Sequence, residues 1–270
     1  QRLIEAQKHL FKSFIQVIAG SIDAKSPYTG GHCNRVPALT FMLARAACDK
    51  KDGPFKDFHL TEEEWYELEV AAGLHDCGKV TTPEYIVDKA TKLETIYNRI
   101  HEVRMRFEVL KRDAVIDYLQ GVLAEEQSEA ELKAALDARL ARLDDDFAFI
   151  AQCNVGGEFM APERIERMKG IAETTWTRTI DDTLGLSIDE MRRRHGEQPK
   201  PPVEEKLLAD KDWHIIPHEV AFDLSQYDAE GFSMRPCAQK YNLGEIYNLS
   251  IGRGTLTAED RFKINEHITQ

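Results

Sequence analysis

The stretch that decides the fold is residues 61–79, TEEEWYELEVAAGLHDCGK. Thr61 followed three residues later by Glu64 forms a capping box, a pattern that marks the N-terminus of a helix. Apolar residues then recur at helical spacing as far as His75, so the histidine shares their face. The pattern predicts a helix that delivers an adjacent His75–Asp76 pair at its C-terminal end.

The His75–Asp76 pair has the chemistry of a metal site. It brings one imidazole nitrogen and two carboxylate oxygens to one place, so Asp76 could bridge two metal ions while His75 binds one of them. Lys79, one turn further, could neutralise a phosphate. A histidine at a helix C-terminus is also favourable without any metal, so the pair alone is weak evidence.

The segment before this helix predicts two more helices. Residues 3–18 mix apolar and polar positions as an amphipathic helix does, and they form either a connecting helix or the first core helix of the domain. Residues 26–31 break the chain. His32 then heads an apolar stripe at helical spacing, and Pro37 inside it predicts a kink or a late helix start.

The segment after the His–Asp pair is more varied. Gly78 suits the end of the helix, and residues 94–150 carry apolar positions, among them Ile96, at helical spacing. Residues 192–202 have the composition of a linker or exposed loop, and residues 205–250 show no clean period. We therefore expect an all-α protein with a large irregular segment.

A second metal site is conceivable at His214 and His218, which are four residues apart. That spacing would place both imidazoles on one helix face, but Pro217 lies between them and disfavours a helix. The sequence therefore argues against this site.

Composition limits the function. The 270 residues carry a net charge of -12, which argues against duplex nucleic acid and anionic membranes as partners. The five cysteines show no CxxC spacing, so we interpret them as buried thiols of a reducing compartment. Since the chain has no signal peptide and no apolar run near the roughly 20 residues of a membrane span, we expect a cytoplasmic protein.

Three segments in order carry a resemblance to a known family. They are DAKSPYTGGH at residues 23–32, LHDCGKV at residues 74–80, and PEYIV at residues 83–87 followed by Lys92-Leu93. Together they closely resemble the HD-GYP family, a branch of the HD phosphohydrolases that hydrolyses the bacterial second messenger cyclic di-GMP. The resemblance implies an HD-domain helical bundle and a metal-dependent phosphodiesterase in signal transduction.

The resemblance also implies roles for individual residues. His32, His75 and Asp76 would be metal ligands, and Lys79 would lie near the scissile phosphate, which makes Asp76 and Lys79 the catalytic candidates. Some members hold a third metal through a glutamate at the position of Tyr28, and tyrosine is a poor substitute. We therefore expect two divalent ions, iron or manganese, with zinc as an alternative.

The next family ligand is a histidine eleven residues after the Leu of a Lys-Pro-Gly-Lys-Leu-Thr-like stretch. After Leu93 that position is Arg104, and His101 comes too early; after a second such stretch at residues 252–257, the position is His267. We therefore interpret residues 94–252 as a large, mostly helical and irregular insertion. His267 is then the ligand, and His101 with a variant spacing is the alternative.

These boundaries define the expected domain organisation. Residues 1–20 form the N-terminal helix, residues 21–93 the first part of the catalytic domain, residues 94–252 the insertion, and residues 253–270 the resumed domain. After this histidine, the family pattern continues with a His-His pair, the Gly-Tyr-Pro motif and a final aspartate. The sequence ends at residue 270, before the positions at which this part of the pattern would occur. We expect a fragment of a longer protein, and an upstream sensor domain and a homodimer are both left open.

Three functions remain open at this point. The first is a phosphodiesterase acting on a cyclic dinucleotide, for which cyclic di-GMP is the expected substrate. The second is a catalytically inactive HD domain that binds a nucleotide or a protein partner and relays a signal. The third is an HD phosphohydrolase acting on another nucleotide.

Overall fold

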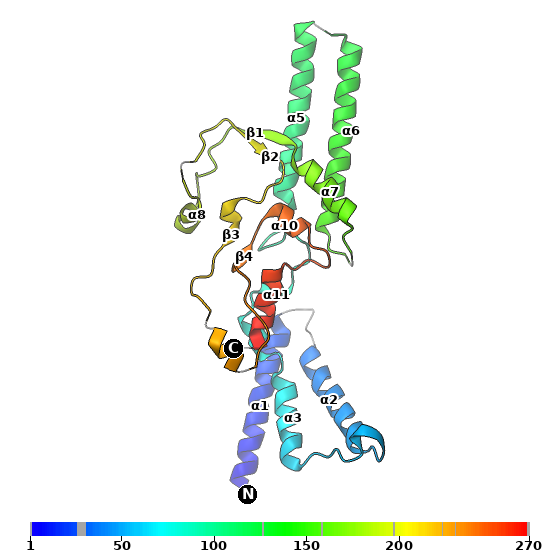
Figure 1. The fold of residues 1–270 in the computed structure, drawn as a ribbon, viewed down its shortest axis with the longest axis vertical. Coiled ribbons are helices and arrows are strands. Elements are labelled where there is room, and N and C mark those ends of the chain that lie inside the picture. Colours follow the sequence, from blue (N-terminus) through cyan, green and yellow to red (C-terminus); the bar gives the residue numbers. More distant parts are fainter. Residues whose placement is uncertain are drawn as a thin grey trace. The chain divides into compact units, whose positions relative to one another are not determined.

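The computed structural model describes residues 2–25, 31–125, 127–157, 159–196, 198–222, 224–229 and 231–268. The chain divides into two compact units (Figure 1). Unit 1 comprises residues 1–88 and 262–270, and unit 2 comprises residues 89–261. Unit 1 is therefore discontinuous in sequence.

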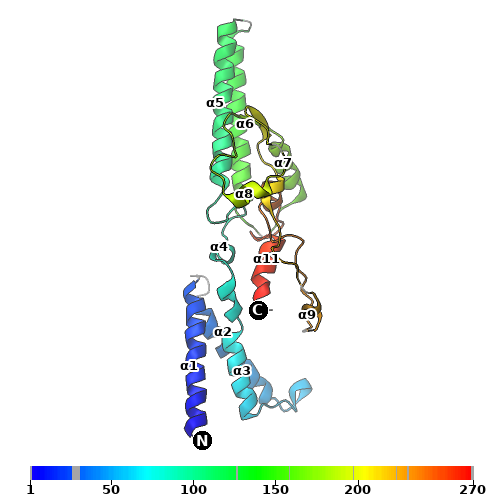
Figure 2. The same cartoon turned by 90° about the vertical axis from the view of Figure 1, so that its left-hand side faces the viewer.

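Unit 1 is built from helices. Its elements are α1 (Arg2–Lys25), α2 (His32–Cys48), η1 (Gly53–Phe55), α3 (Glu62–Leu74), η2 (Cys77–Thr81), α4 (Glu84–Val87) and η4 (Glu266–Ile268), with η denoting a 3-10 helix. The helix α1 packs against α2, α3 and η2, and η2 packs against η4. Figure 2 shows α1 and α3 side by side, as Figure 1 does. This packing brings the two separate parts of the sequence into one unit.

The helix α3 begins as the sequence predicts. The side chain of Thr61 accepts a hydrogen bond from the backbone N–H of Glu64, and the Glu64 carboxylate accepts one from the backbone N–H of Thr61 at 2.7 Å. The predicted end at Gly78 is wrong, because α3 ends at Leu74 with His75 as its C-cap. At Asp76 the backbone leaves the α region, with φ of -114° and ψ of 7°, and η2 follows.

The helix α2 begins at His32, directly after Gly31, whose φ of 75° lies in the left-handed region that favours glycine. A late start is therefore wrong, and Pro37 lies inside the helix. The predicted turn at residues 26–31 falls mostly outside the described residues, and so does Tyr28.

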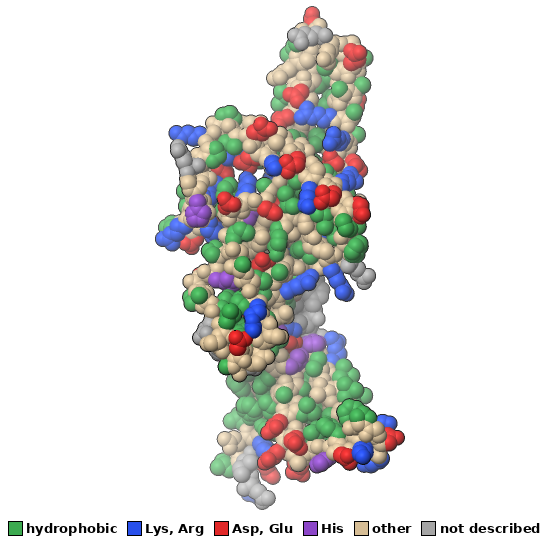
Figure 3. Space-filling view, in the orientation of Figure 1, with side chains coloured by type: hydrophobic (Ala, Val, Ile, Leu, Met, Phe, Trp, Pro, Cys, Tyr) green, Lys and Arg blue, Asp and Glu red, His purple; other side chains and the backbone are tan. Residues whose placement is uncertain are grey.

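The buried core of unit 1 is small. Ala19, Ile22 and Cys33 form a buried cluster where α1 meets the start of α2. By contrast, Leu39 and Leu43 of the predicted apolar stripe are 57% and 72% exposed. Hydrophobic side chains gather on the visible face over α1–α3 in Figure 3. An exposed apolar surface of this kind is uncommon on a monomeric soluble protein.

Unit 2 contains the larger core. Its elements are α5 (Ile100–Ala124), α6 (Glu129–Asn154), α7 (Pro162–Ala172), β1 (Thr175–Arg178), α8 (Ile188–Arg193), β2 (Val203–Lys206), η3 (Asp212–His214), β3 (Ile215–Ile216), α9 (Leu224–Ala229), β4 (Tyr241–Asn242), α10 (Glu245–Leu249) and the first half of α11 (Ala258–Asn265). The helices α5 and α6 form a long antiparallel hairpin (Figures 1 and 2). Buried residues of α5, α6, α7, α10 and the segment after β2 form one cluster.

The strands form two short antiparallel pairs. In β1–β2, Trp176 lies opposite Glu205, and in β3–β4, Ile215 lies opposite Asn242. Helices otherwise dominate the described residues, so the expected all-α class is confirmed. None of the described helices combines the length and the apolar character needed to cross a bilayer.

The predicted helical segment 94–150 needs correction at its start and in its middle. The helix α5 begins only at Ile100, and α6 begins at Glu129 after a break. Ile96 is 87% exposed outside any helix. The loop before α5 is held by remote groups, because Asn154 accepts a hydrogen bond from the backbone N–H of Leu93 at 2.8 Å. Such contacts leave no periodic signal in the sequence.

The two ends of the predicted insertion lie together within unit 2. Lys92 Nζ donates hydrogen bonds to the carbonyl oxygens of Leu249 at 3.0 Å and Ile251 at 2.8 Å. The hydroxyl of Thr255 donates to the carbonyl oxygen of Lys89 at 2.8 Å. The chain between them therefore leaves and returns at one place, as an inserted segment must. The boundaries at 94 and 252 themselves stay a prediction.

The five cysteines are free thiols. Cys33 and Cys153 are buried as expected, whereas Cys77 is exposed. The interpretation of all five as buried thiols is therefore wrong for Cys77, which lies in η2 directly after the chain has left the helix α3, and Cys48 and Cys237 are only half-buried.

Candidate metal centre

Four residues that the sequence singles out meet within unit 1. His32 is the first residue of α2, His75 caps the C-terminus of α3, Asp76 precedes η2, and His267 lies in η4. They come from both sequence segments of the unit. One side chain, Asp76, lies next to the other three.

The Oδ2 atom of Asp76 lies 3.3 Å from Nε2 of His32 and 3.2 Å from Nε2 of His75. The two imidazole Nε2 atoms are 3.3 Å apart. Ligand atoms of His32, His75 and Asp76 thus lie within 4.8 Å of one another, close enough to hold one metal ion. Separations near 3.3 Å suit atoms that share an ion at bond lengths of about 2.1 Å.

The other carboxylate oxygen of Asp76 faces a different histidine. Its Oδ1 atom lies 3.7 Å from Nε2 of His267, whose side chain is only 9% exposed. Because the two oxygens have different histidine neighbours, the carboxylate has the arrangement needed to bridge two ions.

Backbone carbonyl groups fix the orientation of two of the rings. Nδ1 of His75 donates to the carbonyl oxygen of Ala72 at 2.7 Å, and Nδ1 of His267 donates to that of Ile264. In a neutral ring this leaves the lone pair on Nε2, the atom nearest Asp76. Metal-binding histidines are commonly held in this way by a hydrogen bond from their other nitrogen. The donor set therefore fits a divalent metal ion.

Asp76 carries its charge in a largely buried position. Burial alone would raise the pKa of its carboxyl group, but the hydrogen bond and charge of Lys79, with smaller effects from His75 and His32, hold the pKa below its usual value. Lys79 Nζ donates to Asp76 Oδ2 at 2.8 Å. The carboxylate is thus ionised at neutral pH, which metal binding requires.

Asp23 is a supporting residue that the sequence reasoning did not single out. Its Oδ2 atom accepts a hydrogen bond from the backbone N–H of Gly31 at 3.0 Å, and its Oδ1 atom accepts one from Cys33 at 3.4 Å. The carboxylate therefore caps the N-terminus of α2 and fixes the backbone on both sides of His32. Asp23 lies on α1 and not directly before α2, where a capping residue is normally found, so the sequence did not indicate it.

Gly78 allows η2 and η4 to approach each other closely. A Cβ atom at this position would lie 2.2 Å from the carbonyl oxygen of His267, well inside van der Waals contact. Only glycine fits there without moving η4. Gly78 thus allows the segment that carries His267 to lie close to η2.

The competing histidines lie elsewhere in the described chain. His101 belongs to α5 in unit 2, where Arg104 Nη1 lies 2.5 Å from its Nδ1 atom. His214 ends η3, whereas His218 lies beyond β3 and its Nε2 atom is 2.9 Å from the carbonyl oxygen of Cys237. No helix spans His214 and His218, as the sequence predicts.

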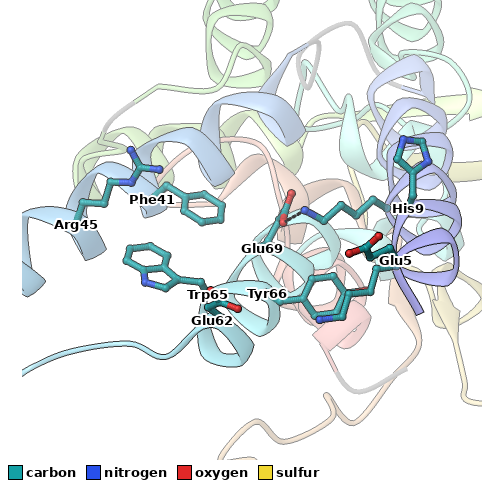
Figure 4. A pocket seen from close by; sticks show the side chains of 10 residues that line it. Glu5, His9, Phe41, Arg45, Glu62, Trp65, Tyr66 and Glu69 are labelled. Atoms are coloured by element: carbon teal, nitrogen blue, oxygen red, sulfur yellow. Dashed lines mark ion pairs between the residues drawn. The ribbon is translucent and has the colours of Figure 1, made fainter. Parts of the chain in front are cut away.

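A cavity of about 700 Å³ in unit 1 does not include the histidine cluster. It is open and lies between α1, α2 and α3, where Phe41 and Trp65 stack with ring centroids 5.6 Å apart (Figure 4). Lys8 Nζ lies 4.9 Å from the centroid of the Tyr66 ring. The ion pair of Lys12 with Glu69 crosses this surface.

Comparison with known proteins gives one partial likeness. Over 95 residues the chain is 33% identical to the 3′3′-cGAMP-specific phosphodiesterase 3 of Vibrio cholerae serotype O1. The match covers 33% of this chain and 18% of that protein, so the chain spans only a small part of its relative's length. No family model matches the chain, and no solved structure matches it.

Proposed function

We propose that this chain is part of an HD-type, metal-dependent phosphodiesterase that hydrolyses a cyclic dinucleotide, with cyclic di-GMP as its substrate. The observation that carries the proposal is the convergence of His32, His75 and Asp76 within 4.8 Å. The likeness to a cyclic dinucleotide phosphodiesterase, although it covers 18% of that protein, points to the same reaction.

The proposed site holds two divalent ions, iron or manganese, and zinc also suits such ligands. Bound ions would supply charge that clamps the phosphodiester and lowers the pKa of an attacking water molecule. The role of this chain is to supply oriented ligands. His32 and His75 face one carboxylate oxygen of Asp76, and His267 faces the other.

Lys79 is proposed to stabilise the phosphate in the transition state. Its ammonium group lies 2.8 Å from Asp76 Oδ2, so it is held at the site by an ion pair and remains 24% exposed. A cation fixed beside the reacting phosphate stabilises developing negative charge. Replacement of Lys79 by methionine should therefore lower kcat more than it changes metal content.

The first test is the double variant His75→Ala with Asp76→Ala in the intact protein. We expect it to lose both bound metal, measured by plasma mass spectrometry, and hydrolysis of the cyclic dinucleotide, measured by chromatography. His59→Ala is a matched control, because that ring contacts the backbone of Asp57 and is not part of the cluster. Undiminished turnover in the double variant would contradict the mechanism.

The substrate needs a separate measurement. Cyclic di-GMP, 3′3′-cGAMP and cyclic di-AMP should be offered to the metal-loaded protein at equal concentration. The proposal expects the highest kcat/KM for cyclic di-GMP. A higher kcat/KM for 3′3′-cGAMP would support the proposed reaction and contradict cyclic di-GMP as the substrate.

The ligand assignment also needs its own test. His267→Ala should lower metal content far more than His101→Ala, because His267 lies beside Asp76 in unit 1 and His101 belongs to unit 2. The reverse ranking would contradict both the ligand role of His267 and the predicted insertion of residues 94–252.

A further inference from the structure

Unit 2 contains a cavity to which the proposed phosphodiesterase reaction gives no role. Its volume is about 500 Å³, within the range of sites for small organic ligands. The walls come from α5, β1, β2, the segment around η3, and α10. All of its lining residues belong to unit 2.

Two indole rings provide flat walls. Trp176 projects from β1 on the same face as Arg178, because side chains two residues apart in a strand share a face. Trp213 lies under two cationic groups, with Arg194 Cζ at 4.2 Å and Lys211 Nζ at 5.1 Å from its ring centroid. Because these two cations already cover the Trp213 ring, Trp176 offers the flat surface on which a planar aromatic group can stack.

A chain of ion pairs holds the charged walls in place. Asp182 joins Arg194 at 2.6 Å to Arg178 at 3.3 Å, and Glu205 joins Arg178 to Lys211 at 2.8 Å. The side chains of Arg178 and Arg194 are only 10% and 9% exposed. Because each group is fixed by the next, a ligand would find these side chains already ordered.

Two hydrogen-bond donors in the lining lack partners among the described residues. The indole N–H of Trp176 is buried without an acceptor. The backbone N–H of Lys211 donates to Nδ1 of His214 at 3.2 Å, so the proton of that neutral ring lies on Nε2, for which no acceptor is recorded. A buried donor without a partner costs about 1–3 kcal/mol, a cost that an acceptor atom on a ligand would remove.

A carboxylate provides complementary acceptor capacity. Glu102 lies in the first turn of α5 and is only loosely paired with Arg106, at 3.9 Å. It accepts a hydrogen bond from Tyr97 on one oxygen and keeps lone pairs for further donors. The cavity therefore presents donors, an acceptor and flat rings together.

A guanine base matches this combination. It has a planar aromatic face for stacking, acceptor atoms for N–H donors, and an edge of N–H groups for a carboxylate. We propose that this cavity binds a guanine nucleotide through its base, as a ligand site separate from the metal centre. The Trp176 ring stacks on the base, Trp176 and His214 donate to its acceptors, and Glu102 accepts from its N–H edge.

The test uses GMP as the probe and the intact chain carrying His75→Ala and Asp76→Ala, so that the metal centre cannot account for binding. We expect GMP to bind saturably, by calorimetry and by a change in tryptophan fluorescence, and more tightly than AMP, CMP or UMP. GMP binding in this variant does not depend on catalysis. A negative binding result would therefore contradict only the ligand site, and a negative activity result would contradict only the proposed phosphodiesterase.

Three substitutions test whether GMP binds in this cavity through the proposed contacts. Trp176→Phe keeps an aromatic face of smaller area and removes the indole N–H group, and Glu102→Gln keeps the shape and removes the charged acceptor. Each should weaken GMP binding about tenfold, the factor expected for roughly 1.4 kcal/mol. Trp65→Phe, in unit 1, should leave the affinity unchanged.

Three results would overturn the proposal. They are the absence of GMP binding at about 1 mM, a range that covers weak complexes, equal affinity for the four nucleotides, and unchanged affinity in both the Trp176→Phe and Glu102→Gln variants. Circular dichroism of each variant checks that it is folded.

Discussion

Asp76 has two carboxylate oxygens with different neighbours, and this single side chain organises the candidate site. Oδ2 faces His32, His75 and Lys79, whereas Oδ1 faces His267. The sequence indicated these residues because an HD pair and its flanking motifs are local. Their mutual distances depend on the packing of four separate elements, which no local pattern encodes.

Gly78→Ala tests the seating of His267. The added Cβ would meet the His267 carbonyl oxygen at 2.2 Å, so η4 must move. We expect a loss of about 1–3 kcal/mol in the free energy of unfolding, the usual cost of overpacking, together with reduced metal content. Urea unfolding and plasma mass spectrometry measure the two effects.

Gly20→Ala is the matched control in the same unit. Gly20 lies inside α1, and nothing lies within 4 Å of the Cβ that alanine would add. Alanine is the better helix former, so this variant should gain about 0.5–1 kcal/mol. Equal metal content in the Gly78 and Gly20 variants would contradict the close-approach argument.

His214 gives unit 2 a pH dependence. Burial, which outweighs the nearby Glu245, lowers the pKa of this histidine from 6.5 to about 4. Between these values the unfolded chain binds a proton that the folded chain does not, so stability is highest above pH 6.5 and falls as the pH drops toward 4. The full loss is at most about 3 kcal/mol.

The His214→Gln variant isolates this effect from the titration of carboxylates. Urea unfolding at pH 7 and at pH 4.5 should show a smaller difference for His214→Gln than for the unchanged protein. If both proteins lose the same stability on acidification, burial of the neutral ring does not contribute.

At the scale of elements, α3 is the helix that its own sequence determines best. Its capping box was predicted from Thr61 and Glu64 and is present in the structure. The C-terminal end of α3 was predicted less accurately than its start. His75 and Asp76 leave the helix because η2 must turn toward η4, a contact between residues far apart in the chain.

Thr61→Ala should weaken α3 and the unit that contains it. Loss of the cap leaves the backbone N–H of Glu64 without its acceptor and should cost about 1 kcal/mol. The fluorescence of Trp65, which lies in α3, follows the urea unfolding of unit 1. Thr61→Ser keeps the oxygen and should restore the midpoint.

Ser187→Ala removes an equivalent capping box from α8 in unit 2. It should leave the Trp65 midpoint unchanged. A shift as large as that of Thr61→Ala would mean that the two helices unfold in one cooperative step.

At the scale of the whole molecule, unit 1 is assembled from two separated segments, whereas the predicted domain boundaries at residues 93 and 253 stay a prediction. Unit 2 depends on an ion pair that the sequence did not indicate. Glu245 is buried and lies 2.9 Å from the guanidinium of Arg106, which is 139 positions earlier in the chain. An ion pair between residues this far apart in the chain produces no local pattern, so it cannot be predicted from a single sequence.

Glu245→Ala should destabilise unit 2 selectively. It leaves the charge of Arg106 partly buried without its partner, which should cost about 3 kcal/mol. The fluorescence of Trp176 and Trp213 in a Trp65→Phe background reports this loss. The Trp65 signal of unit 1, measured in a separate background that carries Trp176→Phe and Trp213→Phe, should shift less.

Asp137→Ala is the control, because it removes only the exposed pair with Lys133 in α6. Its effect should stay within about 0.5 kcal/mol. Equal shifts of both fluorescence signals in Glu245→Ala would contradict the expected selective destabilisation of unit 2.

The discontinuity of unit 1 has a consequence for biosynthesis. Asp76 leaves the ribosome long before His267, which is 191 positions further along the chain. At translation speeds of about 5–20 residues per second, the nascent chain waits roughly 10–40 s with an incomplete ligand set. During this interval the whole of unit 2 is synthesised, and α11, whose residues are divided between unit 2 and unit 1, emerges just before His267. Metal loading through His267 would therefore act as a checkpoint that only a chain translated beyond His267 can pass.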